Sequence, residues 1–450
     1  MRQKHTVQRS IFERYAEHDI GRERNAMSTW LDENKEVLDR VAADLNPDDV
    51  ADTGRPGLTV ESVLRCALLK QHRQMTYAEL EFCLLDSVSC QAFARLPWHW
   101  FPKKSVLHRC ISAITAVTWE QINQRLLHSA QRAKVEQGQM LRIDSTVTDT
   151  PIHAPSDSTL LWDSVRVLVR LLQWAQELAG DPAMIEYRDH RRVAKRRMRA
   201  IRYTRGQDKK AVLYRDLITV TRNTLSYVAG AACRLQALRP VGLIEWPAWQ
   251  AQWQHYRPLI LQVIDQAERR VFAKEKVPAS DKIVSLFEEH SDIIVKGGRD
   301  VQYGHKLNLS TGRSGLILDV VIEAGNPADA ERLLPMLDRH MAQYGQPPRQ
   351  MAADGGYASV ANLHAAKARQ VTDVVFHKKR GLKIEQMAKS PWVYRKLRNF
   401  RAGIEAGISC LKRAYGLGRC TWKGLAHFHA YVWSSVVAHN LALFSRLIST

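Results

Sequence analysis

Residues 141–152 read LRIDSTVTDTPI, in which apolar and polar side chains alternate and Thr and Val are common. This pattern predicts a β-strand. From residue 157 to about residue 290 the pattern changes to long amphipathic helices, such as LLWDSVRVLVRLLQWAQELAG at 160–180. A helical segment is therefore predicted to separate this strand from the rest of its sheet.

Strand patterns return after residue 290. The stretches are DIIVKG (292–297), VQYGHKLNLS (301–310), SGLILDVVIEAG (314–325), RQMAADGGYAS (349–359) and VTDVVFHK (371–378), and the second and third predict a hairpin. Helices are expected near 328–343, 360–369, 399–414 and 425–447. This order predicts an α/β fold whose core is interrupted by a helical insertion of about 140 residues.

The segment that follows residue 57 is predicted to be helical. Thr59 can cap a first helix, and Thr76 with Glu79 forms the capping box of a second. A short turn between them would make a helix-turn-helix-like unit, and a plain helical bundle fits the pattern equally well. Pro and Gly in DDVADTGRPG, residues 48–57, indicate a linker.

The chain is strongly basic, with 66 Lys and Arg against 46 Asp and Glu and a formal net charge of +20. This excess suits a polyanion such as DNA, although a ribosome-binding or membrane-surface protein would share it. The N-terminus lacks the apolar run of a signal peptide, and the apolar stretch 426–444 carries three His and an Asn, which indicates a packed helix. Seven Cys form no CxxC pair, which argues against a structural zinc site. We therefore expect a cytoplasmic, nucleoid-associated protein with no membrane partner.

Three acids stand out by their predicted positions: Asp144 lies in the first strand, Asp354 at a strand end before two Gly, and Glu405 in a late helix. A carboxylate on a central strand is costly unless it is paired or binds a metal. Ligands of open α/β sheets bind beyond the carboxyl ends of strands. Asp149 is a weaker alternative to Asp144, because strand alternation places it on the opposite face. Each acid alone is more often structural, but together they predict a site.

The helix of Glu405 carries basic residues on the same face. Arg401, Glu405, Ile408 and Lys412 follow the spacing i, i+4, i+7, i+11. A surface Arg–Glu pair is the structural alternative. Carboxylates bind hard cations, and two such ions can activate a nucleophile and stabilise the leaving oxygen at a phosphodiester. The pattern predicts metal-dependent phosphoryl transfer, with Arg401 and Lys412 holding a phosphate.

Several stretches resemble insertion-sequence transposases of the insertion-sequence 4 and 5 superfamily. They are LRIDST (141–146), AADGGYAS (352–359) and, most specifically, RAGIEAGISCLKRAYGLGRCTWKG (401–424). The stretch DSTVTDTPIHAPSDSTLLWDSVRVL (144–168) is similar to the ISNCY group in particular. The resemblance covers most of residues 58–443.

This resemblance implies a ribonuclease-H-like mixed-sheet catalytic core and an N-terminal helical DNA-binding domain. It also implies a catalytic triad of Asp144, Asp354 and Glu405 that holds two Mg²⁺ or Mn²⁺ ions. Related families carry a Tyr, an Arg and a Lys on the Glu helix. Arg401 and Lys412 match the last two. The Tyr position holds Arg398, so the role of that Tyr is absent or has moved, for example to Tyr394.

Two basic runs add to this prediction. Residues 378–401 hold nine Lys or Arg against one acid, directly before the Glu helix, so DNA contact is favoured there. Residues 188–210 hold eleven against two acids, and a solvated helix face is as good an interpretation. The predicted DNA contacts are Arg401, Lys412, Arg398, Lys306, Lys378, Lys379 and Arg380.

The predicted domains are an N-terminal arm and linker at 1–57, a helical DNA-binding domain at 58–135, a catalytic core at 136–152 and 291–424, a helical insertion at 153–290 and a C-terminal helix at 425–450. The expected function is a transposase that binds terminal inverted repeats, cleaves DNA and joins 3′-hydroxyl ends to a target. It is expected to act on double-stranded DNA as a homodimer or larger assembly. A DNA-binding derivative that no longer cuts, or a metal-dependent nuclease without strand transfer, are the alternatives.

Overall fold

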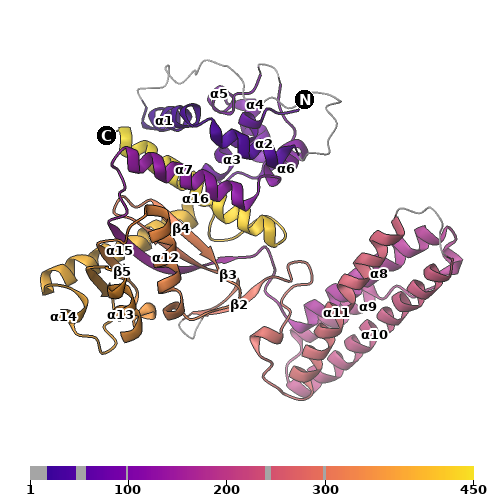
Figure 1. The fold of residues 1–450 in the computed structure, drawn as a ribbon. Coiled ribbons are helices and arrows are strands. Elements are labelled where there is room, and N and C mark those ends of the chain that lie inside the picture. Colours follow the sequence, from indigo (N-terminus) through magenta and orange to yellow (C-terminus); the bar gives the residue numbers. More distant parts are fainter. Residues whose placement is uncertain (1–17, 47–56, 98–99, 239–244, 297–299, 450) are drawn as a thin grey trace. The chain divides into compact units, whose positions relative to one another are not determined.

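The structure is a computed structural model that describes residues 18–46, 57–97, 100–238, 245–296 and 300–449 (Figure 1). The chain divides into two compact units, one of residues 1–151 with 304–450 and one of residues 152–303. Each unit has its own hydrophobic core. The predicted linker at 48–57 lies, except for Gly57, outside the described residues.

The described strands form one mixed, six-stranded sheet with the order β2-β3-β1-β5-β6, and β4 pairs with β3. Strand β1 is antiparallel to β3 and parallel to β5, while β5 and β6 are parallel. The strands are β1 (Met140–Asp149), β2 (Asp292–Lys296), β3 (Asp300–Thr311), β4 (Ile317–Ile322), β5 (Gln350–Ala353) and β6 (Asp373–Phe376). The mixed α/β architecture that the sequence predicts is confirmed, and it is consistent with a ribonuclease-H-like core.

Helices surround this sheet in the first unit. Those before β1 are α1 (Asp19–Glu33), α2 (Glu36–Leu45), α3 (Val60–His72), α4 (Tyr77–Asp86), α5 (Val88–Ala94), α6 (Lys104–Ser112) and α7 (Ala116–Arg132). Those after β4 are α12 (Leu333–Tyr344), α13 (Val360–Ala368), α14 (Ile384–Met387), α15 (Pro391–Ala414) and α16 (Leu425–Ser449). The predicted caps are confirmed: Thr59 accepts from the Ser62 N–H, and Thr76 and Glu79 form a capping box.

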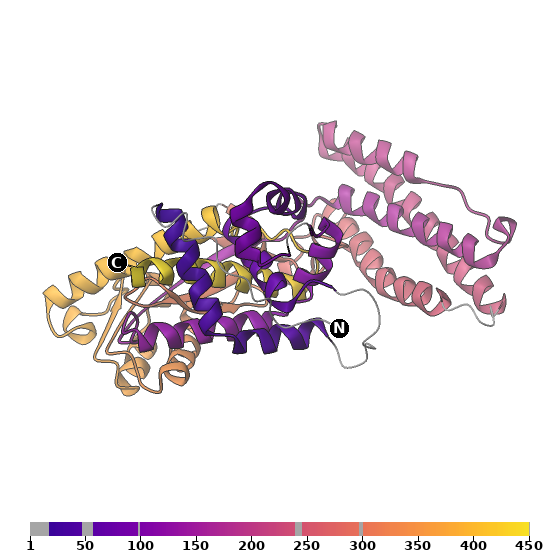
Figure 2. The ribbon, with the colours of Figure 1, turned by 90° about the horizontal axis from the view of Figure 1, so that it is seen from above.

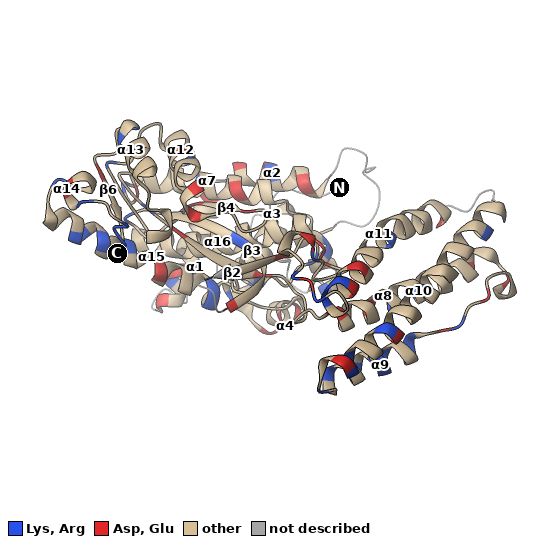
Figure 3. Cartoon of the chain, turned by 90° about the horizontal axis from the view of Figure 1, so that it is seen from below, with Lys and Arg blue, Asp and Glu red and all other residues tan. Residues whose placement is uncertain are grey.

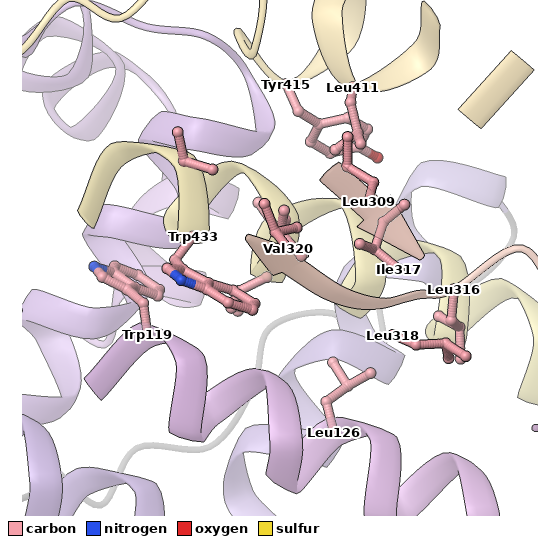
Figure 4. Packing of buried hydrophobic residues seen from close by; sticks show 14 of the residues in the cluster. Trp119, Leu126, Leu309, Leu316, Ile317, Leu318, Val320, Leu411, Tyr415 and Trp433 are labelled. Atoms are coloured by element: carbon pink, nitrogen blue, oxygen red, sulfur yellow. The ribbon is translucent and has the colours of Figure 1, made fainter. Parts of the chain in front are cut away.

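The C-terminal helix α16 packs into the core of this unit. Trp433 of α16 and Trp119 of α7 lie close to Val320 of β4 (Figure 4). Asn440 of α16 accepts from the Ile317 N–H (2.9 Å) and donates to the Ile317 carbonyl (2.8 Å). These bonds satisfy buried backbone groups at the start of β4. Within the described residues, no helix is both long enough and apolar enough to span a membrane.

In the described part of the second unit, four helices form a bundle: α8 (Asp157–Ala179), α9 (Arg191–Tyr203), α10 (Gln207–Leu238) and α11 (Glu245–Val271) (Figures 1 and 2). The Trp249 indole donates to the Leu171 carbonyl (2.9 Å) inside its core. The expectation that helices continue to about residue 290 was wrong, because α11 ends at Val271 and a short 3-10 turn at Ala279–Asp281 follows. Pro278, just before that turn, has no N–H to continue a helix.

The helix that carries Glu405 also differs from the prediction. It begins at Pro391 and not near Asn399. Ser390 caps it by accepting from the Val393 N–H, and Pro suits the first helical position because its missing N–H would be unpaired there. Arg398 therefore lies inside the helix.

Candidate active site

Three carboxylates meet one guanidinium. The Arg401 Nη2 atom lies 2.8 Å from Asp144 Oδ2 and 3.6 Å from Asp354 Oδ1, and Nη1 donates to Glu405 Oε1. The Arg401 side chain is 7% exposed, compared with 13% for Asp144, 40% for Asp354 and 62% for Glu405. The structure therefore brings the three predicted triad acids together, two of them with oxygens open to solvent.

The sheet register explains why two of these acids are neighbours. Strands β1 and β5 are parallel, and Ile143 is paired with Ala353. Asp144 and Asp354 each follow one member of that pair, so they occupy equivalent positions on strands about 4.8 Å apart. Asp354 comes one residue after the end of β5, where the backbone leaves the sheet.

Helix α15 is attached to the sheet by Arg142, which the sequence analysis did not single out. Its guanidinium donates to the Phe400 carbonyl (2.7 Å) and to Thr311 Oγ1 (2.6 Å), and it lies 4.6 Å from the centre of the Phe400 ring. Arg142 and Asp144 are two residues apart and so share one face of β1. The available signal was a second charged residue on the same face of the strand as Asp144, two positions before it.

A second acid, Asp149, lies further along the same strand within range of basic charges. Asp149 is near Lys412 and Arg419, whose charges lower its pKa, but burial outweighs them and the pKa of Asp149 is raised. Five strand residues from Asp144 to Asp149 rise about 16 Å, and eleven helical residues from Arg401 to Lys412 rise about the same distance. The equal rises bring Lys412 of α15 level with Asp149, which fits the influence of the Lys412 charge on the pKa of Asp149.

The end of β5 is also tightly packed. A Cβ atom on Gly355 would lie 2.7 Å from Lys378 Cβ, so the Lys378 stem runs directly beside the residue after Asp354. Tyr357 is fully buried and donates to Asn308 Oδ1 (2.6 Å). Burial, together with the charges of Asp329 and Asp144, raises the pKa of Tyr357, so its hydroxyl stays protonated and remains a donor.

The predicted DNA contacts other than Arg401 and Lys412 divide into two groups. Arg398, Lys378, Lys379 and Arg380 are exposed. Lys306 is buried, and its ammonium lies 2.6 Å from both the Pro327 carbonyl and Asp329 Oδ1. Both partners bind the ammonium group that was predicted to contact a phosphate, so this arrangement gives Lys306 a structural role. Tyr394, suggested as a substitute for the family Tyr, is buried and donates to the Phe376 carbonyl (3.4 Å).

The donor set suits a divalent metal chemically. Three carboxylates supply hard oxygen ligands, and those of Asp354 and Glu405 are accessible. As arranged around Arg401, however, the carboxylates point to its guanidinium. No group of three or more His, Cys, Asp or Glu in the described part of the chain is placed as a metal site.

Comparison with known proteins adds one finding. Residues 294–441 match the family model of the transposase DDE domain. No curated protein and no solved structure matches the chain. The matched region contains Asp354, Arg401 and Glu405, while Asp144 precedes it and joins them through the pairing of β1 with β5. The match supports a DDE transposase family for this chain, and with it an enzyme of the transposase or nuclease type.

Proposed function

We propose that the chain is a DNA transposase that cleaves at the terminal inverted repeats of an insertion sequence and joins the freed 3′-hydroxyl ends to target DNA. Within the DDE transposases we place it in the insertion-sequence 4 and 5 superfamily, ISNCY group, acting as a homodimer or larger assembly on DNA. The observation that carries the proposal is the meeting of Asp144, Asp354 and Glu405 at Arg401, from two strands and a helix.

The proposed reaction is two successive displacements at phosphorus. In the first, water forms a P–O bond while the bond to the 3′-oxygen breaks, which releases a 3′-hydroxyl. In the second, that hydroxyl forms a P–O bond with target DNA while a target P–O bond breaks. Asp144, Asp354 and Glu405 would hold two Mg²⁺ or Mn²⁺ ions, which when bound activate the attacking oxygen and stabilise the leaving one.

The protein's own groups would orient the DNA. Asp144 is held by the sheet, and its Oδ1 accepts from the Ser145 N–H (2.8 Å), which fixes the carboxylate plane. Exposed cations on the segment before α15 and on α15 itself, Lys378 and Arg398 among them, would bind the phosphates that flank the cleaved bond. Arg401 would move from the carboxylates to a phosphate oxygen once metal charge replaces its own.

The test is cleavage of DNA that carries the element ends, with Mg²⁺ or Mn²⁺. Asp144→Asn, Asp354→Asn and Glu405→Gln, made singly, should each lower the cleavage rate at least about 100-fold. Asp338→Asn is the matched control, because Asp338 is an exposed acid of α12 that pairs with Arg369 (2.6 Å). Full cleavage by all three variants would overturn the proposal.

The products distinguish the alternatives. Pre-cleaved ends with free 3′-hydroxyls should be joined to a second DNA. Cleavage without joined product would identify a metal-dependent nuclease, and binding without cleavage would identify a DNA-binding derivative.

A further inference from the structure

Helix α9 of the second unit carries a stripe of cations. Seven of its thirteen residues, Arg191–Tyr203, are Lys or Arg, and none is acidic. Five exposed members lie at i, i+3, i+4, i+7 and i+10, and so on one face. This basic stripe consists of Arg192, Lys195, Arg196, Arg199 and Arg202.

The opposite face of α9 is the one that packs. Ala194 and Ile201 are buried in the core of the second unit, and Met198 is half-buried against it. The helix is therefore held in place by apolar contacts, which leave the basic stripe turned outward. Figure 3 shows Lys and Arg along this helix.

Among the residues that the structure describes, none supplies a carboxylate partner to the stripe. In the described parts of the chain, Arg191 pairs with Asp189 (2.6 Å) and Arg197 with Asp216, but no ion pair joins a member of the stripe to an acid. Lys195 instead lies 5.8 Å from the centre of the Trp162 ring. Four members of the stripe line one surface pocket of about 510 Å³ together with Val193.

In the free protein, repulsion between the cations of the stripe lowers the stability of α9. Like charges at i, i+3 and i, i+4 destabilise a helix. An ordinary solvated helix offsets its Lys and Arg with acids at those spacings, whereas α9 has none. A bound polyanion would remove the repulsion.

We infer that the basic stripe of α9 is a second DNA-binding surface, which binds the phosphate backbone of duplex DNA and belongs to the compact unit that does not hold the three carboxylates. This inference rests on the proposed function, which supplies the DNA. The stripe spans about 15 Å from Arg192 to Arg202, and phosphates recur about every 3.4 Å of helix axis on each DNA strand. Four of its five members are Arg, whose planar fork matches a phosphate.

The charge pattern favours DNA over an anionic membrane. A helix that lies on a membrane inserts its apolar face among the lipids. The apolar face of α9 is already buried by α8 and α10, so only its cations are available. Backbone binding without base contacts also fits a surface with one exposed aromatic residue, Tyr203.

The test compares two triple variants that lose the same charge. The stripe variant is Arg192→Gln, Arg196→Gln and Arg199→Gln. The control variant is Arg166→Gln, Arg191→Gln and Arg222→Gln, whose arginines are similarly exposed but pair with Asp163, Asp189 and Glu268. Binding of a duplex and binding of phosphatidylserine vesicles are each measured in EDTA over a range of salt concentrations, with thermal unfolding in parallel.

In the stripe variant the slope of log K against log salt should become less steep by about 2–3, because each lost phosphate contact contributes about 0.9. Its unfolding temperature should stay the same or rise. The control variant should keep the wild-type slope within about 1. Equal slopes for the two variants would overturn the inference, as would a stripe variant that loses binding only to phosphatidylserine vesicles.

Failure of the proposed function gives a different result. A wild-type protein that cleaves end-containing DNA, but whose stripe variant binds as tightly as the control, contradicts the α9 inference alone. A wild-type protein that binds DNA through the stripe without any metal-dependent cleavage contradicts the proposed function alone.

Discussion

Arg401 is the residue on which the candidate site depends. Three carboxylates close together repel one another, and a single buried guanidinium offsets that repulsion by contacting all of them. The sequence predicts Arg401 as a phosphate ligand, because it shares a helical face with Glu405. In the structure Arg401 contacts the acids themselves, so any metal and Arg401 compete for the same oxygens.

Arg401→Gln should therefore lower stability but increase the response to metal. Removing one partner of a buried ion pair costs roughly 3 kcal/mol, because the remaining charge is left without compensation. A cation that binds only the folded state stabilises it, and tighter binding gives a larger stabilisation. Thermal unfolding with and without Mn²⁺ should show a lower apo unfolding temperature for the variant than for the wild type, and a larger upward shift on adding Mn²⁺.

Arg339→Gln is the matched control for this measurement. Arg339 of α12 also pairs with two acids, Asp319 of β4 and Glu120 of α7, and neither belongs to the candidate site. It should lose stability without any change in the Mn²⁺ shift. If Arg401→Gln and wild type respond equally to Mn²⁺, the competition does not exist.

At the scale of elements, the site depends on how α15 meets β1. The Arg142 guanidinium donates a hydrogen bond to the Phe400 carbonyl and passes directly over Gly403. A Cβ atom at Gly403 would lie 2.2 Å from Arg142 Nη1. Gly403 thus leaves room for the contact that attaches the helix one turn before Glu405.

Gly403→Ala should displace Arg142 and reduce the cleavage rate about tenfold or more, since small misplacements of reacting groups are costly. DNA binding should be unchanged. Gly407→Ala is the control on the same helix, because nothing lies within 4 Å of its added Cβ. It should keep its activity and gain about 0.5–1 kcal/mol of stability, as Ala is the better helix former. Equal activity of the two variants would show that Arg142 does not position α15.

The helices and strands of this chain illustrate which features its sequence predicts and which it does not. Hydrophobic periodicity and helix capping are local signals. Residues such as Thr76 and Asp144 therefore sufficed to predict the caps, the strands and the acids of the candidate site. The start of α15 was missed because its signal is a Ser–Pro pair eight residues earlier. Hydrophobic periodicity gives no information on contacts between distant segments. For that reason it did not predict the pairing of Lys306 with Asp329 or the contacts of the carboxylates with Arg401.

Helix α4 illustrates a related limit. Its cap was predicted correctly, yet YAELEFCLLD contains three acids and no Lys or Arg. A recognition helix needs cations or amides toward the DNA, so α4 does not have the composition of one. DNA binding by residues 58–135 stays a prediction, and it would have to use other helices of that segment.

The described part of the whole molecule is organised around two separate hydrophobic cores. The triad acids and Arg401 lie in the unit of residues 1–151 and 304–450, and the basic stripe lies in the unit of residues 152–303. Since local stability depends on the contacts within each core, a ligand of one unit should protect mainly that unit from hydrogen exchange.

Hydrogen exchange with mass spectrometry can test this separation in the full chain. Mn²⁺ without DNA should slow exchange in β1, around Asp354 and in α15, because cation binding would draw these segments together. It should leave α8 to α11 unchanged. A short duplex in EDTA should instead slow exchange in α9. Asp144→Asn should lose the effect of Mn²⁺ and keep that of DNA, and the stripe variant should do the reverse. A uniform response of both units to Mn²⁺ would contradict two independently stabilised cores and would require a single cooperative unit in their place.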